Sequence, residues 1–274
     1  MQAQHRKARQ FQQLHQANEA FVLGNPWDSG TARLLSDMGY KALGTTSAGY
    51  AYTLGRRDNT VDRDEMLVNI RAIVEATDLP VSGDLENGYG DAPEAVAETI
   101  RLGAEAGLVG ASIEDAVPGR DSPVYDIGLA TERVAAAVEA ARALPYPFTL
   151  TARAENFMVG LPDLDDTIRR LQAYQEAGAD VLYAPALKER AQIEAIVGSV
   201  ERPVNVLMGL KGVSLDLAEL NAMGVRRVSI GSGFARAAYG AFLEAAREVR
   251  EHGTFTFADR AIGYHDIAAL LDRR

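Results

Sequence analysis

A short pattern occurs four times along the chain: the end of a helical segment, a glycine, and then a run of apolar residues. The glycine suits the end of a helix, where the backbone turns into the left-handed conformation that glycine adopts without steric cost. The apolar run behind it suits a strand that is covered on both faces. The four copies are LLSDMGYKALGTT, AEAGLVGASIED, QEAGADVLYAPA and NAMGVRRVSIGS.

Four further apolar runs fill the gaps between these copies and complete a set of eight expected strands. Amphipathic helical segments lie between them. Because parallel strands need crossover connections, strands that alternate with helices predict a parallel sheet. The further strands are expected at 20–25, 79–84, 147–153 and 202–208, and the helices near 29–38, 62–76, 93–106, 128–143, 163–177, 188–198 and 214–223.

For a chain of 274 residues, this alternation predicts an α/β fold of the (βα)8 TIM-type barrel class. A doubly wound open sheet is the alternative, but GNPWDSG follows the first strand in place of the usual dinucleotide-binding fingerprint. No linker divides the chain, so we expect a single domain over 1–274. The barrel is expected at about 18–240 and a helical tail at about 241–274, with a long helix at 232–253 leading into it.

The composition argues against several classes of protein. Without cysteine there can be no disulfide, thiolate nucleophile or sulfur metal ligand, which favours a reducing cytoplasm. The net charge of −10 argues against binding to nucleic acid or anionic membranes. No apolar run approaches the ~20 residues that span a bilayer. The basic first residues lack an apolar signal core, so they predict an N-terminal helix rather than an export signal.

Acidic residues follow two consecutive expected strands. Asp84 and Glu86 lie in GDLENGYG, and Glu114 ends SIED after the next strand. In an α/β barrel the active site lies at the carboxyl ends of the strands. Carboxylates this close repel one another unless a cation lies among them, and an oxygen-only cluster suits Mg²⁺ or Mn²⁺. A helix N-terminal acid or a solvated turn is the alternative, and Asp91 is interpreted as such a cap of the following helix.

Arg153 and Glu155 follow the next expected strand, in TARAEN. Residues i and i+2 on a strand share a face, so both side chains can enter the barrel mouth. An arginine there can bind a carboxylate through two parallel hydrogen bonds. The spacing equally allows a plain salt bridge between Arg153 and Glu155.

Three loops carry further signals. In GTTSAGY at 44–50, small hydroxyl residues can expose N–H groups to an anion, although a plain Ser/Thr loop is the alternative. GSG at 231–233 resembles a phosphate-binding turn and equally suits the start of a helix. The segment EDAVPGRDSPVYD at 114–126 is too long for a routine βα loop and predicts a lid.

Together these motifs resemble the isocitrate lyase / phosphoenolpyruvate mutase superfamily. The matching pieces are TTSAGYAYTLGRRD, GDLENGYG, SIED with its irregular loop, TARAEN and PVNVL, in the family's order over about 18–240. The resemblance implies an α/β barrel whose eighth helix is exchanged between neighbouring subunits of a homodimer or homotetramer.

The resemblance also implies a Mg²⁺ site, with Mn²⁺ as a possible substitute. Family substrates are small 2-oxo acids, or hydroxy acids that release them. The ion chelates the 2-oxo group and a carboxylate oxygen, and stabilises an enolate as a bond to the third carbon breaks. Asp84 would be the direct ligand, and the ion's waters would be held by Glu86, Glu114 and Asp58.

For the substrate, the resemblance implies hydroxyl and backbone donors to a carboxylate. These donors would come from Thr46, Ser47 and Ala48. Arg153 would add its guanidinium, and Asn205 would supply a further polar contact.

The chain departs from the family at the lid. Isocitrate and methylisocitrate lyases carry a Lys-Lys/Arg-Cys-Gly-His lid whose cysteine is the acid, whereas this lid reads AVPGRDSPVYD. Those two activities are therefore not expected, and the phosphonomutase lid with its Lys and Asn is absent as well. Candidate lid or proton-handling groups are Tyr50, Tyr89, Arg120, Asp121 and Tyr125. The histidines lie outside the strand ends and are expected at the surface; they are His5, His15, His252 and His265.

Three functions follow from the sequence. The first is a Mg²⁺-dependent lyase or decarboxylase of a small 2-oxo acid, such as an oxaloacetate-like compound. The second is phosphonate chemistry on a phosphonopyruvate-like compound, which needs cationic lid groups such as Arg120. The third is a non-catalytic 2-oxo acid binder.

Overall fold

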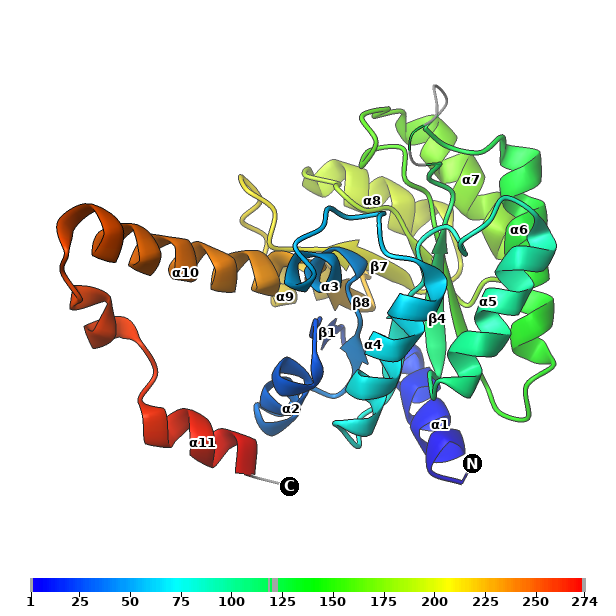
Figure 1. Cartoon of the computed structure of the whole chain (residues 1–274). Coiled ribbons are helices and arrows are strands. Elements are labelled where there is room, and N and C mark those ends of the chain that lie inside the picture. Colours follow the sequence, from blue (N-terminus) through cyan, green and yellow to red (C-terminus); the bar gives the residue numbers. More distant parts are fainter. Residues whose placement is uncertain (1, 118, 120–122, 273–274) are drawn as a thin grey trace.

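A computed structural model describes residues 2–117, 119 and 123–272 of the chain. In this part of the chain, eight strands form one parallel sheet in the order β1-β8-β7-β6-β5-β4-β3-β2. A parallel bridge between Gly24 and Leu43 joins the two outer strands and nearly closes the sheet into the expected (βα)8 barrel (Figure 1). The strands are β1 (Phe21–Leu23), β2 (Leu43–Gly44), β3 (Val81–Asp84), β4 (Gly110–Glu114), β5 (Thr149–Arg153), β6 (Val181–Tyr183), β7 (Val204–Leu207) and β8 (Arg227–Ser229).

Helices alternate with the strands and cover the barrel. They are α2 (Ser29–Asp37), α4 (Arg63–Glu75), α5 (Pro93–Glu105), α6 (Ile127–Arg142), α7 (Leu164–Glu176), α8 (Arg190–Ser199) and α9 (Leu217–Ala222). The side chains of Asp28, Asp62 and Asp216 accept backbone N–H bonds in capping boxes at the starts of α2, α4 and α9. The glycines of the fourfold sequence pattern all have positive φ, which confirms them as helix ends; they are Gly39, Gly107, Gly178 and Gly224.

Helix α1 (Gln2–Gln16) packs against the amino end of the barrel. Phe11 is buried, and the Gln4 amide donates to the carbonyl oxygens of Ala104 and Leu108. His15 is buried as well, so its expected surface position is wrong. Its helix places it against the strands, where burial, followed by the charge of Arg227, lowers the pKa of His15 to about 3.

Of the other histidines, His252 and His265 are exposed as expected, and His5 is half-buried. His252 and His265 lie in the tail that follows the barrel, whereas His5 belongs to α1. Burial of a histidine is therefore decided by where its helix docks, which the expected strand positions do not show.

The tail begins with α10 (Gly233–His252), which extends away from the barrel as a long arm (Figure 1). Near its start, the Tyr239 ring lies 6.1 Å from that of Tyr52 on α3 (Ser47–Thr53). A short helix η1 (Thr256–Arg260) turns the chain, and α11 (Tyr264–Asp272) packs against α2. No helix in the described part of the chain is long and apolar enough to cross a membrane.

Candidate active site

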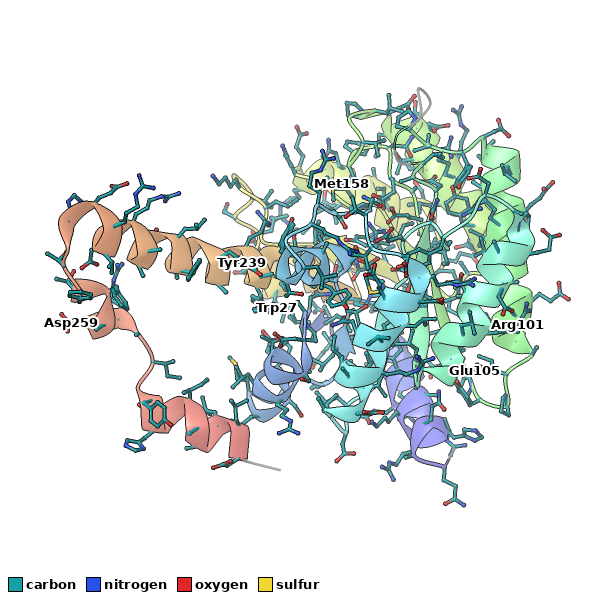
Figure 2. The ribbon with its side chains drawn as sticks, viewed as in Figure 1. Trp27, Arg101, Glu105, Met158, Tyr239 and Asp259 are labelled. Atoms are coloured by element: carbon teal, nitrogen blue, oxygen red, sulfur yellow. The ribbon has the colours of Figure 1, made fainter. Side chains whose placement is uncertain are left out.

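A cleft of about 400 Å³ opens at the carboxyl ends of the strands. One wall is apolar and includes Met158, which Figure 2 labels. A second cleft of about 430 Å³ lies at the amino end, beside His15. Because α/β-barrel enzymes place their chemistry at the carboxyl ends, the first cleft is the candidate site. It brings together seven of the expected site residues: Thr46, Ser47, Ala48, Asp58, Asp84, Glu114 and Arg153.

Arg153 lies at the centre of this site. Its Nη1 is 3.0 Å from Asp84 Oδ1, its Nη2 is 3.0 Å from Glu114 Oε2, and its Nε donates to Glu155 Oε1 at 2.8 Å. Both sequence interpretations therefore hold, because Arg153 pairs with Glu155 and also reaches the mouth. Burial opposes its charge, but the surrounding carboxylates raise the pKa of Arg153 well above its usual range.

Asp84 links β3 to the segment after β2. Its Oδ2 accepts hydrogen bonds from the Ser47 backbone N–H at 3.1 Å and the Ser47 hydroxyl at 2.9 Å. The Ser47 hydroxyl also lies 3.1 Å from Asp58 Oδ1. The expected loop is helix α3, with Thr46 as its N-cap. Because the Ser47 N–H is used by Asp84 here, donation to a substrate carboxylate stays a prediction.

Glu86 is buried with one carboxyl oxygen, Oε1, that lacks a hydrogen-bond partner in the described part of the chain. It adopts a positive φ of 47°. Burial, together with the Asp84 and Asp58 carboxylates, raises the pKa of Glu86 to about 8. Burial and Asp84 likewise raise the pKa of Asp58, and burial raises that of Glu114. The site therefore holds more carboxyl groups than the single charge of Arg153 can balance in their ionised form.

This excess of oxygen ligands fits a hard divalent cation. In the described part of the chain, however, no three carboxylate or imidazole groups converge closely enough to ligate one ion together. That arrangement fits one direct ligand, Asp84, with Glu86, Glu114 and Asp58 acting through water. These assignments stay predictions.

The loop after β3 is held by hydrogen bonds from Arg133, a residue that the sequence analysis did not identify. The Arg133 guanidinium donates to the carbonyl oxygens of Asn87, Gly90 and Asp91. It also lies over the Tyr125 ring, 4.1 Å from its centroid. No local motif marks Arg133, because its partners lie more than forty positions earlier in the chain.

The expected helix cap at Asp91 is wrong. The N-cap of α5 is Ala92, which makes no side-chain capping bond. The Asp91 carboxylate instead accepts a hydrogen bond of 2.7 Å from the Tyr125 hydroxyl. Asp91 therefore ties the loop after β3 to the lid segment rather than opening a helix.

The two described ends of the lid segment lie against each other. Ala116 and Val124 form an antiparallel bridge, and the Val117 N–H donates to the Pro123 carbonyl at 2.8 Å. Arg120 and Asp121, the expected lid groups, lie outside the described residues. Closure of the lid stays a prediction.

Asn205 lies inside the barrel, below the cleft. Its Oδ1 accepts from Arg227 Nε at 2.9 Å, and its Nδ2 donates to Ser229 Oγ at 2.9 Å. Both ends of the amide are thus engaged by protein groups, and the expected substrate contact stays a prediction. At GSG, the Gly231 N–H donates to the Asn25 side chain at 3.1 Å, and Ser232 precedes α10 without a side-chain cap.

The fold and the site together define an α/β-barrel enzyme with an acidic mouth organised around a buried arginine. Residues 11–250 match the family model for phosphoenolpyruvate phosphomutase. The chain belongs to that family, and thus to the isocitrate lyase / phosphoenolpyruvate mutase superfamily of lyases and mutases.

Individual relatives agree with this placement. A crystal structure from Burkholderia cenocepacia, provisionally assigned as a lyase/mutase, shares 58% identity at a TM-score of 0.97, over 100% of this chain and 98% of that one. An oxaloacetate decarboxylase from Rhodopseudomonas palustris is 30% identical over 74% of this chain and 70% of its own length. An oxaloacetate acetylhydrolase, solved with its product oxalate, shares 27% identity at a TM-score of 0.86, over 97% and 93% of the two chains.

Proposed function

We propose that the protein is a Mg²⁺-dependent carbon–carbon lyase or decarboxylase that acts on a small 2-oxo acid, in the first place a 2-oxo dicarboxylate. The observation that carries this proposal is the cleft itself. Arg153 offers N–H donors to an organic anion, and the carboxyl groups of Asp58, Asp84 and Glu114 in the same cleft supply oxygen ligands that suit a hard cation. Relatives that act on oxaloacetate support the same substrate class.

In this proposal the bound Mg²⁺ supplies a Lewis acid that stabilises negative charge developing on the 2-oxo oxygen. Asp84 would hold the ion directly, with Glu86, Glu114 and Asp58 on its waters. Arg153 Nη1 contacts the same Asp84 carboxylate that would hold the ion. An Arg153 N–H released from that carboxylate would donate to a substrate carboxylate. The apolar wall of the cleft, which includes Leu207 and Ile230, excludes water from one side.

The direct test uses oxalate as a probe of the 2-oxo acid site. We expect oxalate to raise the unfolding temperature only when Mg²⁺ is present. At 100 times its Kd, oxalate should add about 2.7 kcal/mol to the free energy of unfolding. Oxaloacetate is then assayed with Mg²⁺ for pyruvate, or for oxalate and acetate. If neither oxalate nor any member of a 2-oxo acid panel stabilises the protein in a Mg²⁺-dependent way, the proposal is wrong.

Phosphonate chemistry is a second candidate, because the matching family model is that of a phosphomutase. Phosphonopyruvate incubated with the enzyme and Mg²⁺, and followed by phosphorus NMR, separates the two functions. Conversion of the phosphonate signal would favour the second. Tight oxalate binding without turnover of any panel compound would favour a non-catalytic binder.

We also propose that the protein forms a homodimer or homotetramer in which the arm docks on a neighbouring subunit. The large apolar side chains Phe242, Leu243 and Val249 of α10 are exposed, with 63% of Phe242 accessible. Exposed apolar patches of this kind commonly mark interfaces between proteins. Sedimentation is expected to show an oligomer that F242E/L243E converts to monomer. A monomeric wild-type chain would refute this assembly.

A further inference from the structure

A row of polar side chains crosses the barrel interior from the mouth toward the amino end. Neighbouring strands pair in register Glu114 with Arg153, Arg153 with Tyr183, Tyr183 with Asn205, and Asn205 with Arg227. Because barrel strands are tilted and staggered, a row of paired residues also moves along the barrel axis. The row therefore connects the candidate site to Arg227, which contacts Thr151, two residues before Arg153 on β5.

Arg227 is a buried cation without an acidic partner among the described residues. Its guanidinium contacts three neutral groups: Asn205 Oδ1 at 2.9 Å, Thr151 Oγ1 at 3.0 Å and His15 Nε2 at 3.3 Å. Burial lowers the pKa of Arg227 to about 10, so the group stays charged at neutral pH. An unpaired buried charge is costly, and a core built for stability alone would favour an apolar residue there.

Two hydrogen bonds lead from Arg227 toward Tyr183. Arg227 donates to Asn205, and the Asn205 amide donates to Ser229 Oγ. These two bonds run the same way, so they polarise one another and restrain the groups they join. The Ser229 hydroxyl lies beside the Tyr183 phenol at one small cavity, and it opposes the rise that burial causes in the pKa of Tyr183.

Tyr183, which follows Arg153 in the row, contacts the Arg153 guanidinium. The Arg153 guanidinium lies over the Tyr183 ring, 5.1 Å from its centroid, a favourable contact between a cation and an aromatic face. A cavity of about 50 Å³ borders Arg153, Tyr183, Asn205, Arg227 and Ser229. Because this cavity adjoins the row, close packing does not hold these side chains on that side. The hydrogen bonds among Arg227, Asn205 and Ser229, and the contact of Arg153 with the Tyr183 ring, therefore help to hold them in place.

We propose that Arg227 is a positioning residue for Arg153: acting through Asn205, Ser229 and Tyr183, it sets the direction in which the Arg153 guanidinium faces the cleft. The inference deepens the proposed function, in which Arg153 receives the substrate anion. It also gives Asn205 an indirect role in place of the expected substrate contact. The competing interpretation is that Arg227 only stabilises the barrel core.

The first test needs no ligand. In ¹⁵N-labelled protein, the Nε–H resonance of Arg153 is assigned by its loss in Arg153→Lys. Arg227→Met is expected to shift this resonance and speed its exchange with solvent by about tenfold, because the guanidinium loses its fixed position. Ser229→Ala, which leaves the Arg227–Asn205 bond in place, is expected to act in the same direction. Arg142→Met, which removes an arginine paired with Asp180 near the amino end, is the matched control.

The second test measures affinity by calorimetry. Arg227→Met is expected to weaken oxalate binding in saturating Mg²⁺ by about tenfold, since small misplacements of a binding group are costly. Its affinity for Mg²⁺ alone is expected to stay within about twofold of wild type, within the scatter of additive effects at separated sites.

An unchanged Arg153 resonance in both Arg227→Met and Ser229→Ala would overturn the inference, even if Arg227→Met lowers the unfolding temperature. Should Arg227→Met fail to fold, Asn205→Leu, which removes the acceptor of the Arg227 Nε bond, is measured in its place. If wild type binds no oxalate, the proposed function fails, and the resonance still tests the positioning role.

Discussion

Replacing Asp84 with asparagine is expected to weaken Mg²⁺ binding by at least about 100-fold, more than the loss of a residue that acts through water. Asparagine keeps the shape of the side chain but removes the negative charge that a hard cation requires. The hydrogen bond from the Asp84 backbone N–H to the Thr45 side-chain oxygen Oγ1 is untouched, so the end of β3 should keep its path. Glu86 and Asp58 also lose a repelling neighbour.

The fold should therefore survive this change. We expect the free energy of unfolding of the metal-free protein to move by no more than about 1 kcal/mol, because relief of repulsion offsets the lost pairing with Arg153. Calorimetric titration with Mg²⁺, and urea unfolding in a chelator, measure the two quantities separately. Asp126→Asn is the matched control, since Asp126 caps α6 and asparagine caps equally well. Wild-type Mg²⁺ affinity in Asp84→Asn would refute the metal assignment.

The sequence predicted the architecture well, for a physical reason. Short apolar runs behind helix-ending glycines are local signals, and alternation of strands and helices leaves few topologies. Once the barrel is assumed, residues at strand ends must meet at one mouth. This reasoning predicts that Asp84, Glu114 and Arg153 share one site, and the three residues line the same cleft.

Local patterns could not reveal the partners that depend on how the barrel closes. Arg133 on α6 donates hydrogen bonds to the loop after β3, and no sequence pattern around Arg133 indicates this contact. Asp91 followed the usual pattern of a helix cap, but Tyr125 claims its carboxylate. His15 is polar and lies on an amphipathic helix, and only the docking of α1 shows that it faces Arg227.

The row of polar residues in the barrel interior, from Glu114 to Arg227, could not be predicted for a related reason. Asn205 and Arg227 each lie four residues before a glycine that follows their strand, Gly209 and Gly231, so alternation alone does not say whether they reach the mouth or the core. Strand register decides this, because a barrel row descends as it crosses from β5 to β8. The family resemblance implies a substrate contact at Asn205, which stays a prediction, whereas its bonds to Arg227 and Ser229 are seen only in the structure.

Replacing Arg153 with methionine is expected to have the largest effect on both ligand binding and stability. Oxalate affinity should fall by at least about 100-fold, the loss of a charge-assisted pair. Mg²⁺ affinity should fall far less, because Asp84 remains. Glu114 and Glu155 would be left buried without their cation, at a cost of about 3–5 kcal/mol in the free energy of unfolding.

The pH dependence of this loss distinguishes its cause. Burial already raises the pKa of both Glu114 and Glu155 above the ordinary value of 4.5, and removal of Arg153 takes away the charge that opposes that rise. Above pH 4.5 the unfolded chain then releases protons that the folded protein keeps. Each such group lowers stability by about 1.4 kcal/mol per pH unit until its folded-state pKa is reached. Arg153→Met should therefore be closer to wild type at pH 5.5 than at pH 8.

A charge-balanced variant separates the two roles of Arg153. Adding Glu114→Gln and Glu155→Gln to Arg153→Met removes the uncompensated acids, so urea unfolding at pH 8 should recover most of the lost stability while oxalate binding stays weak. Recovery of oxalate binding together with stability would show that Arg153 serves the fold and does not bind the anion. Equal losses of Mg²⁺ and oxalate affinity in Arg153→Met would point the same way. We expect the triple variant to regain stability without regaining anion binding. This result would follow if Arg153 both balances buried carboxylates and faces the substrate.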